Sequence, residues 1–211
     1  MKERGMIFNS EMVRAILDGR KTQTRRIMKE QPVLNGNFYE VFGSAWSKGM
    51  TSIPAVPGHS LSTRCPFGAV GDRIWVRETF CPVDDTQYGG EKWVDYRATP
   101  RYEASHPAGW DSAPNDAEAL KWRPSIHMPR WASRILLEIT GVRVERLNSI
   151  SDADAKAEGC CYGRGGGVPD FAVTPADHFP TLWASIYGEE SWKANPWVWV
   201  IEFKRVEGGA A

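Results

Sequence analysis

The sequence predicts an α+β fold in which a small mixed β-barrel is flanked by short helices, within a single domain that spans residues 1–211. Segments with strand periodicity outnumber those with helix periodicity, and most strands follow one another as antiparallel neighbours. The order is strand, helix, several strands, short helix, helix and strand, which suits a barrel with helices against it. Two stretches without a lasting period, about 30–70 and 81–121, interrupt this order as long insertions.

The composition is typical of a soluble globular protein, with 42% hydrophobic and 25% charged residues. No apolar run approaches the ~20 residues of a membrane span, and residues 1–9 lack the apolar core of a secretory signal. We therefore expect a cytoplasmic protein with no membrane partner. The 26 basic and 26 acidic residues balance, which argues against coating of nucleic acid by bulk charge but leaves room for a local basic groove.

Residue types that ligate metals are not grouped in this sequence. The four cysteines form no C-x-x-C pair, and the four histidines show no ligand spacing. We therefore expect no metal site and no cofactor, and thiols that are buried or partly exposed.

The first elements are a short strand at residues 6–8 and a helix that Asn9 or Ser10 can cap. Gly19 ends this helix as its C′ residue. Its apolar face consists of Met12, Val13, Ile16 and Leu17.

From Thr22 the pattern becomes two-fold, so that Thr22, Thr24 and Arg26 share one face of a strand and Gln23 and Arg25 lie on the other. A helix that ends directly into a strand forms a concave corner. An ammonium group and a hydroxyl can converge on one ligand there.

The middle of the chain alternates irregular stretches with strands. The insertion at about 30–70 is rich in Pro and Gly, with scattered aromatic residues, and is predicted to be irregular. Gly71-Asp72 is a turn that opens a strand at 73–80. The insertion at about 81–121 contains one further strand, at 93–98.

Two strands, 135–140 and 142–147, precede a short helix that Ser151 caps in a capping box. The helix carries Glu158 in its last turn and ends at Gly159. A carboxylate is unfavourable there relative to the helix dipole, at a cost of a few tenths of a kcal/mol. The placement is easier to understand if Glu158 points at cations or at a substrate.

The stretch at 160–169 is rich in glycine but lacks the G-x-G-x-x-G and Walker spacings, so we interpret it as a loop and not as a nucleotide cradle. Thr174 caps the next helix, which has an i, i+3, i+4, i+7 apolar stripe and ends at Gly188. The last strand, at 197–204, alternates strictly.

Basic residues are concentrated at the helix-to-strand corner. Residues 19–26, G-R-K-T-Q-T-R-R, hold four basic side chains and two threonines, and the surrounding residues 20–29 contain no acid. Cations beside hydroxyls suit an anionic or strongly polar ligand. The structural alternative is that the cations complement the preceding helix dipole and that the threonines belong to an ordinary strand.

Two other places combine charge with apolar surroundings. Glu78 ends the apolar face of the strand at 73–80, where it needs a cationic partner or a function, and both readings stay open. Residues 122–134 contain three arginines, one histidine and two tryptophans without an acid. This composition suits stacking on bases and binding of phosphates, or a proline-bounded loop whose tryptophans fill the core.

The pattern G-x-K-x-x-T-x-R at residues 19–26 matches the signature of the ASCH family, whose fold is PUA-like. The later elements of that family follow in order: the turn at 71–72, the short helix with Glu158, and the strand with W-V-I-E-F at 199–203. Over nearly its whole length the chain resembles an ASCH protein, and most of all the longer ASCH proteins of phages and prophages.

The resemblance implies an activity. Small bacterial members of the family include amidohydrolases that remove the acetyl group of N4-acetylcytidine with a lysine, a threonine and a glutamate. The motif places the first two at Lys21 and Thr24, and the end of the short helix places the third at Glu158, with Glu78 as a competitor. The implied protein is a hydrolase of a modified pyrimidine nucleoside, with two insertions that the small enzymes lack.

The residues suit this chemistry, because amide hydrolysis needs a nucleophile, a proton shuttle and a group that steadies the oxyanion. The Thr24 hydroxyl would attack, and Lys21 would be its base if burial and nearby cations lower the lysine pKa. Glu158 would protonate the departing amino group or orient the base. Arg26 or His127 would hold the oxyanion, and Trp75 or Trp131 would stack on the pyrimidine. The predicted substrate-binding residues are Arg26, Trp75, Glu78, His127, Arg130 and Trp131.

The alternative function belongs to another class. The chain would be a non-catalytic RNA-binding or modified-base-binding ASCH module of phage origin, acting as a regulator or counter-defence factor. That alternative predicts salt-dependent binding of RNA without any product.

Overall fold

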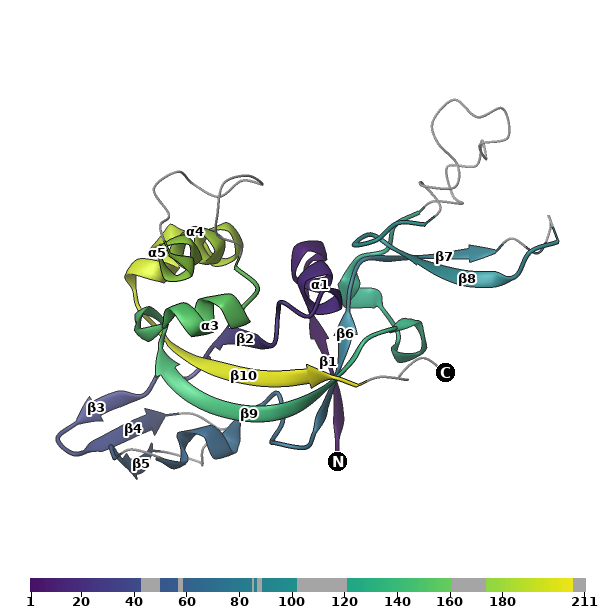
Figure 1. The fold of residues 1–211 in the computed structure, drawn as a ribbon. Helices are drawn as coiled ribbons and strands as arrows, with labels where there is room; N and C mark the ends of the chain where they lie inside the picture. Colours follow the sequence, from purple (N-terminus) through teal and green to yellow (C-terminus); the bar gives the residue numbers. More distant parts are fainter. Residues whose placement is uncertain are drawn as a thin grey trace.

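The computed structural model describes residues 1–42, 50–56, 59–84, 86, 89–101, 121–160 and 174–206, and Figure 1 shows their arrangement. The sequence predicts a glycine-rich loop at 160–169, and apart from Cys160 that stretch lies outside the described residues. The fold is α+β, as predicted, and sheets form most of it.

A five-stranded sheet forms the centre, in the order β1-β6-β9-β10-β2. The strands are β1 (Glu3–Ile7), β2 (Gln23–Ile27), β6 (Arg73–Arg77), β9 (Leu136–Arg146) and β10 (Trp197–Arg205). The pair β1–β6 is parallel and the other pairs are antiparallel. The two strands predicted at 135–140 and 142–147 are one continuous strand, because β9 passes through Gly141 as it pairs with β10.

The predicted barrel is not closed by strand pairing among the described residues, since β1 and β2 are the two edges of the sheet. The connection between these edges is the helix α1 (Ser10–Leu17). A side chain bridges them instead of a backbone ladder: Arg26 Nη2, on β2, donates to the Ile7 carbonyl oxygen of β1 at 2.6 Å.

The helices begin at the residues that the sequence indicates. Asn9 caps α1 by accepting the Met12 N–H at 2.8 Å. The helix α3 (Asp152–Ala157) starts with a capping box at Ser151, and α4 (Pro175–Tyr187) starts with one at Thr174. A short helix, α5 (Glu189–Lys193), follows α4 directly.

Two cores pack against opposite faces of β10, because its side chains alternate. Trp199, Ile201 and Phe203 belong to the main core, which α1 covers. Val198 and Val200 belong to a second core beneath α3 and α4. The residue pairs of β10 and β2 place Thr24 opposite Ile201 and Arg25 opposite Val200. Thr24 and Arg25 therefore lie on different faces of the sheet, as the two-fold pattern predicts.

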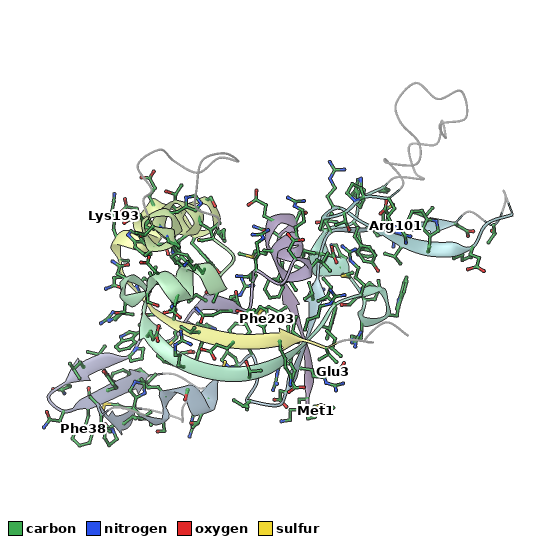
Figure 2. All side chains as sticks on the ribbon, viewed as in Figure 1. Met1, Glu3, Phe38, Arg101, Lys193 and Phe203 are labelled. Atoms are coloured by element: carbon green, nitrogen blue, oxygen red, sulfur yellow. The ribbon has the colours of Figure 1, made fainter. Side chains whose placement is uncertain are left out.

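The first insertion is more regular than predicted. It contains a three-stranded sheet of β3 (Val33–Asn35), β4 (Phe38–Phe42) and β5 (Met50–Pro54). Gly36, with φ +57°, allows the turn between β3 and β4. Only the inner face is buried, at Val41 and Ile53, whereas Phe38 on the outer face is exposed (Figure 2).

The second insertion contributes a hairpin of β7 (Phe80–Asp84) and β8 (Lys92–Tyr96). In Figure 1 this hairpin projects from the body on the opposite side of α1 from α3 and α4. The 3-10 helices that lie wholly within the described residues are η1 (Ser60–Arg64), η3 (Ser125–His127), η4 (Arg130–Ala132) and η5 (Leu147–Ser149).

Candidate functional site: a buried ion pair at a helix-to-strand corner

The corner between α1 and β2 is joined to the end of α3 by backbone hydrogen bonds. Gly19, with φ +74°, lets the chain reverse after α1, and the Lys21 N–H donates to the Ala15 carbonyl at 2.9 Å. The Thr22 N–H donates to the Ala157 carbonyl at 2.8 Å. These bonds fix the start of β2 against the C-terminal end of α3.

Lys21 and Glu158 meet at this junction. Lys21 Nζ lies 2.8 Å from Glu158 Oε2 and 2.8 Å from the Glu158 main-chain oxygen. The two side chains are only 1% and 5% exposed. Burial lowers the pKa of the Lys21 amine below 10.5; the carboxylate of Glu158 opposes this shift, and the charge of Arg26 adds to it. The amine is thus closer to its neutral, basic form than an exposed lysine.

Arg25, which the sequence indicated only as one of the cations near Lys21, is a direct partner of Glu158. Its side chain is 0% exposed, and Nη1 lies 3.2 Å from Glu158 Oε1. Nη2 lies 3.3 Å from Glu145 Oε2 and 3.4 Å from Asp154 Oδ2. The Glu158 carboxylate therefore bridges two buried cations, one on each oxygen. The Nε–H of Arg25 is buried without a hydrogen-bond partner among the described residues.

Arg143 extends the ion pairs across the sheet and fixes the carboxylates that hold Arg25. Its guanidinium lies 2.5 Å from Glu145 and 2.5 Å from Asp154, and it also contacts Glu202. Charged groups that share several partners are held rigidly, since moving any one of them leaves another unpaired.

Thr24 is buried beside this network. Thr24 lines a narrow recess together with Glu158 and Arg25. The aromatic side chains of Phe179, Trp183 and Tyr187 line the same recess. Both faces of β2 can contribute because β2 is an edge strand. The free space inside is small, about 10 Å³.

A wider cleft lies in front of the recess, between α1, the end of α3 and α4. Its volume is about 290 Å³, and it shares Met12, Glu158 and Leu182 with the recess as lining residues. Gly159 and Cys160 also line the cleft. Glu158 is therefore reachable from a space large enough for a small polar ligand.

The residues predicted to bind substrate lie elsewhere among the described residues, and none of them lines the cleft or the recess. Arg26 contacts the Tyr187 hydroxyl at 3.3 Å and lies over the Phe8 ring. Trp75, on β6, stacks with Arg77. Their contribution to substrate binding stays a prediction.

Glu78 is held by Arg134 through two contacts of 3.0 Å, which gives it the structural partner that the sequence left open. Arg130 contacts Glu3 at 3.0 Å, and Glu3 is labelled in Figure 2. His127 belongs to η3, and Trp131, in η4, is 69% exposed.

The sequence carried only part of the signal for this arrangement. The G-x-K-x-x-T-x-R pattern and the position of Glu158 at the helix end indicated the three residues Lys21, Thr24 and Glu158. The sequence indicated Arg25 only as one of the cations that could lower the Lys21 pKa, and not as a partner of Glu158. The burial of Arg25 opposite Val200, beneath α3 and α4, brings it to Glu158 at the end of α3.

A search with family models finds no match to this chain, and comparisons with curated proteins and with solved structures likewise find none. Within the described ranges, no three His, Cys, Asp or Glu side chains are grouped so that they could hold a metal ion. No helix in those ranges is long and apolar enough to cross a membrane.

Proposed function

We propose that the protein is an amidohydrolase that removes an acyl group from a modified pyrimidine nucleoside such as N4-acetylcytidine, and that it is a PUA-like protein of the ASCH family. The observation that carries this proposal is the contact of Lys21 Nζ with Glu158 Oε2 at 2.8 Å, beside a recess that Thr24 also lines. Lys21 lies just before β2, Thr24 lies in β2, and Glu158 ends α3. Glu158 pairs with the amine of Lys21 and lines the recess together with Thr24.

The proposed reaction has two stages. Thr24 Oγ1 forms a bond to the acyl carbon while its proton passes to the neutral amine of Lys21. The bond between that carbon and the exocyclic nitrogen then breaks, and the nitrogen takes the proton from Lys21 as the free nucleoside leaves. Water next adds to the threonine ester, which releases the carboxylic acid and restores Thr24. Glu158 orients Lys21 throughout, which their contact supports.

Arg25 is the group best placed to steady the oxyanion of this reaction. Its Nε–H is a buried donor that has no partner among the residues that the structure describes, and Arg25 lines the same recess as Thr24. Such a donor is satisfied when an oxyanion forms beside it, so the interaction is stronger in the transition state than in the free enzyme. We therefore assign to Arg25 the role that the sequence suggested for Arg26 or His127.

Substrate entry requires a small rearrangement. A free volume of about 10 Å³ is at the lower limit for one water molecule, too little for an acyl group. Met12 and Leu182 line both spaces. Both are flexible apolar side chains, and a change of rotamer in them opens the recess to the cleft on the timescale of side-chain motion.

The test is release of cytidine and acetate from N4-acetylcytidine by the purified protein and by Lys21→Ala and Thr24→Ala. The matched controls are Lys29→Ala and Thr22→Ala, which alter exposed residues of the same types nearby. We expect both site variants to lose at least a hundredfold in kcat and both controls to keep wild-type turnover. Equal turnover in all five proteins would remove the proposed roles.

One observation favours the second function, a non-catalytic module that binds RNA or a modified base. Lys21 and Glu158 satisfy each other and Arg25 completes the set, so the cluster is also stable as a purely structural link. A wild-type protein that binds RNA with salt-dependent affinity and forms no product would favour this alternative.

A further inference from the structure

The β7–β8 hairpin borders a second hollow that the proposed reaction does not use. Its volume is about 490 Å³, and its lining residues among those described are Pro82, Lys121, Trp122, Arg123, Pro124 and His127. Two of these are permanent cations and one is a histidine, and none is acidic. In a chain with equal numbers of acids and bases, the described part of this lining is rich in basic side chains.

The backbone holds these side chains in place. The Arg123 N–H donates to the Phe80 carbonyl at 2.7 Å, and the Phe80 N–H donates to the Arg123 carbonyl at 3.2 Å. Residue 123 thus pairs with the first residue of β7. His127 ends a 3-10 turn in which its N–H donates to the Pro124 carbonyl at 2.9 Å. Arg123 and His127 are therefore presented from hydrogen-bonded backbone.

The base of the hairpin is anchored as well. The carboxylate of Asp95, which is buried in β8, accepts the N–H of Tyr96 at 2.8 Å and the N–H of Arg101 at 2.9 Å. Arg101 is labelled beside the hairpin in Figure 2. Arg97 lies 5.2 Å from the ring centroid of Trp122, so one wall of the hollow is an indole that already packs against a guanidinium.

An aromatic groove adjoins the cationic hollow. Pro82 lines both spaces, and the groove, of about 280 Å³, is lined further by Trp93, Val94 and the exposed Trp131. The groove also contains Asp84 and Lys92, which are 3.0 Å apart and form an ion pair. The groove is thus nearly neutral and aromatic, and the hollow on the other side of Pro82 is cationic.

Alternation of negative charge and flat aromatic surface is the chemistry of a single-stranded nucleic acid. We propose that the cationic hollow and the aromatic groove together, named the hairpin surface, bind single-stranded nucleic acid. A phosphate would lie against Lys121, Arg123 and His127, and a base would stack on Trp131. The exposed indole offers a face for stacking, which is worth roughly 1–3 kcal/mol per base. The β7–β8 hairpin lies on the opposite side of α1 from α3 and α4 (Figure 1), and the hollow shares no described lining residue with the cleft, so it is a separate site.

The experiment measures binding of fluorescein-labelled 12-nucleotide single strands to the full chain by fluorescence anisotropy, at several salt concentrations. One arm uses RNA and another uses DNA of the same sequence, which shows whether the surface prefers one of the two kinds of single strand. A third arm uses duplex DNA, in which the bases are not free to stack. We expect both single strands to bind more tightly than the duplex.

Three variants identify the surface. Lys121→Gln/Arg123→Gln removes two cations, and we expect at least tenfold weaker binding and a salt slope that is smaller by about 1.4, since each contact with a single strand contributes about 0.7. Trp131→Ala should weaken binding at least fivefold without a change in the slope. The control is Lys29→Gln/Lys204→Gln, which removes two exposed cations from elsewhere and should bind as the wild type does.

Thermal unfolding of each variant shows whether it is folded. Folded Lys121→Gln/Arg123→Gln protein with wild-type affinity would overturn the proposal, and so would a wild type that binds no single strand at 50 mM salt. Loss of binding in the control pair equal to that in the hairpin pair would indicate bulk charge instead of a site, and would overturn it as well. None of these readouts depends on amide hydrolysis.

Discussion

Lys21 Nζ lies 2.8 Å from Glu158 Oε2, although 137 positions separate the two residues in the chain. Glu158 also accepts from the same nitrogen through its main-chain oxygen. On its other carboxylate oxygen it contacts Arg25. The end of α3 is thus tied to the start of β2 by one carboxylate between two buried cations, and this geometry makes the roles of the two partners unequal.

Removing the carboxylate should cost more stability than removing the amine. Glu158→Gln leaves Lys21 buried without its anion, so we expect a loss of about 3 kcal/mol in the free energy of unfolding. Lys21→Met leaves Glu158 paired with Arg25, so its loss should be about half as large. Urea denaturation with a constant m-value measures both. Equal losses of unfolding free energy in the two variants would show that Arg25 does not stabilise the Glu158 carboxylate when Lys21 is absent.

The pH dependence of turnover should report the Lys21 amine. The base is the neutral amine, which exists above its pKa, and burial lowers that pKa below 10.5. We therefore expect kcat for N4-acetylcytidine to rise with pH and to reach its plateau below pH 10.5. Lys21→Arg keeps the positive charge but cannot lose its proton in this range. Its turnover should stay low at every pH, and a rise like that of the wild type would exclude Lys21 as the base.

Gly159 should be sensitive to a single added methyl group. Its φ is +85°, and a Cβ at this position would lie 3.0 Å from Ala15 Cβ and 3.1 Å from Lys21 Cβ. Gly159→Ala therefore combines backbone strain with a clash at the ion pair, and we expect a loss of about 2 kcal/mol and reduced turnover.

The matched control for that change is Gly19→Ala. Gly19 also has a positive φ, of +74°, but a Cβ there would meet nothing within 4 Å. It should lose about 1 kcal/mol from backbone strain alone and keep its turnover. If the two variants have the same stability and activity, crowding at Lys21 has no effect.

Local patterns were sufficient to predict the elements that enclose the site. Ser151 and Thr174 were placed correctly as helix caps, and Asn9 was one of the two caps considered for α1, because a cap depends on a few neighbouring residues. The two-fold pattern of β2 was also correct, and it separated Thr24 from Arg25 by face. Each of these features is decided within about one turn or one strand of sequence.

What the sequence did not reveal depends on contacts between distant segments. The role of Arg25 requires Glu145, Asp154 and Glu158 to converge on it, and no local pattern indicates that convergence. The sheet of β3, β4 and β5 was missed because only its inner face is buried, while apolar residues such as Phe38 and Phe42 stay exposed on its outer face. When apolar residues occur on both faces of a strand, the sequence does not show the alternation of apolar and polar residues that indicates a strand.

Glu78 allows a test of a second buried pair, away from the proposed chemistry. Burial raises the pKa of its carboxyl, and the hydrogen bonds and charge of Arg134 oppose that rise. In Arg134→Met the opposing effect is gone, so the folded-state pKa of Glu78 should rise further above its unfolded value of about 4.5. Between these two values the folded state binds more protons than the unfolded state, so the stability of the variant should fall as pH rises through this window.

We expect Arg134→Met to lose about 3 kcal/mol relative to the wild type at pH 7, where the carboxylate is buried without its partner, and clearly less at pH 5. Glu78→Gln/Arg134→Met is the control, because it removes the ionisable group and should show no such dependence. Urea denaturation at the two pH values measures the difference. A loss of the same size at both would mean that Glu78 stays ionised without Arg134, and that packing of the Arg134 guanidinium on the Tyr96 ring, 3.9 Å from its centroid, accounts for the loss.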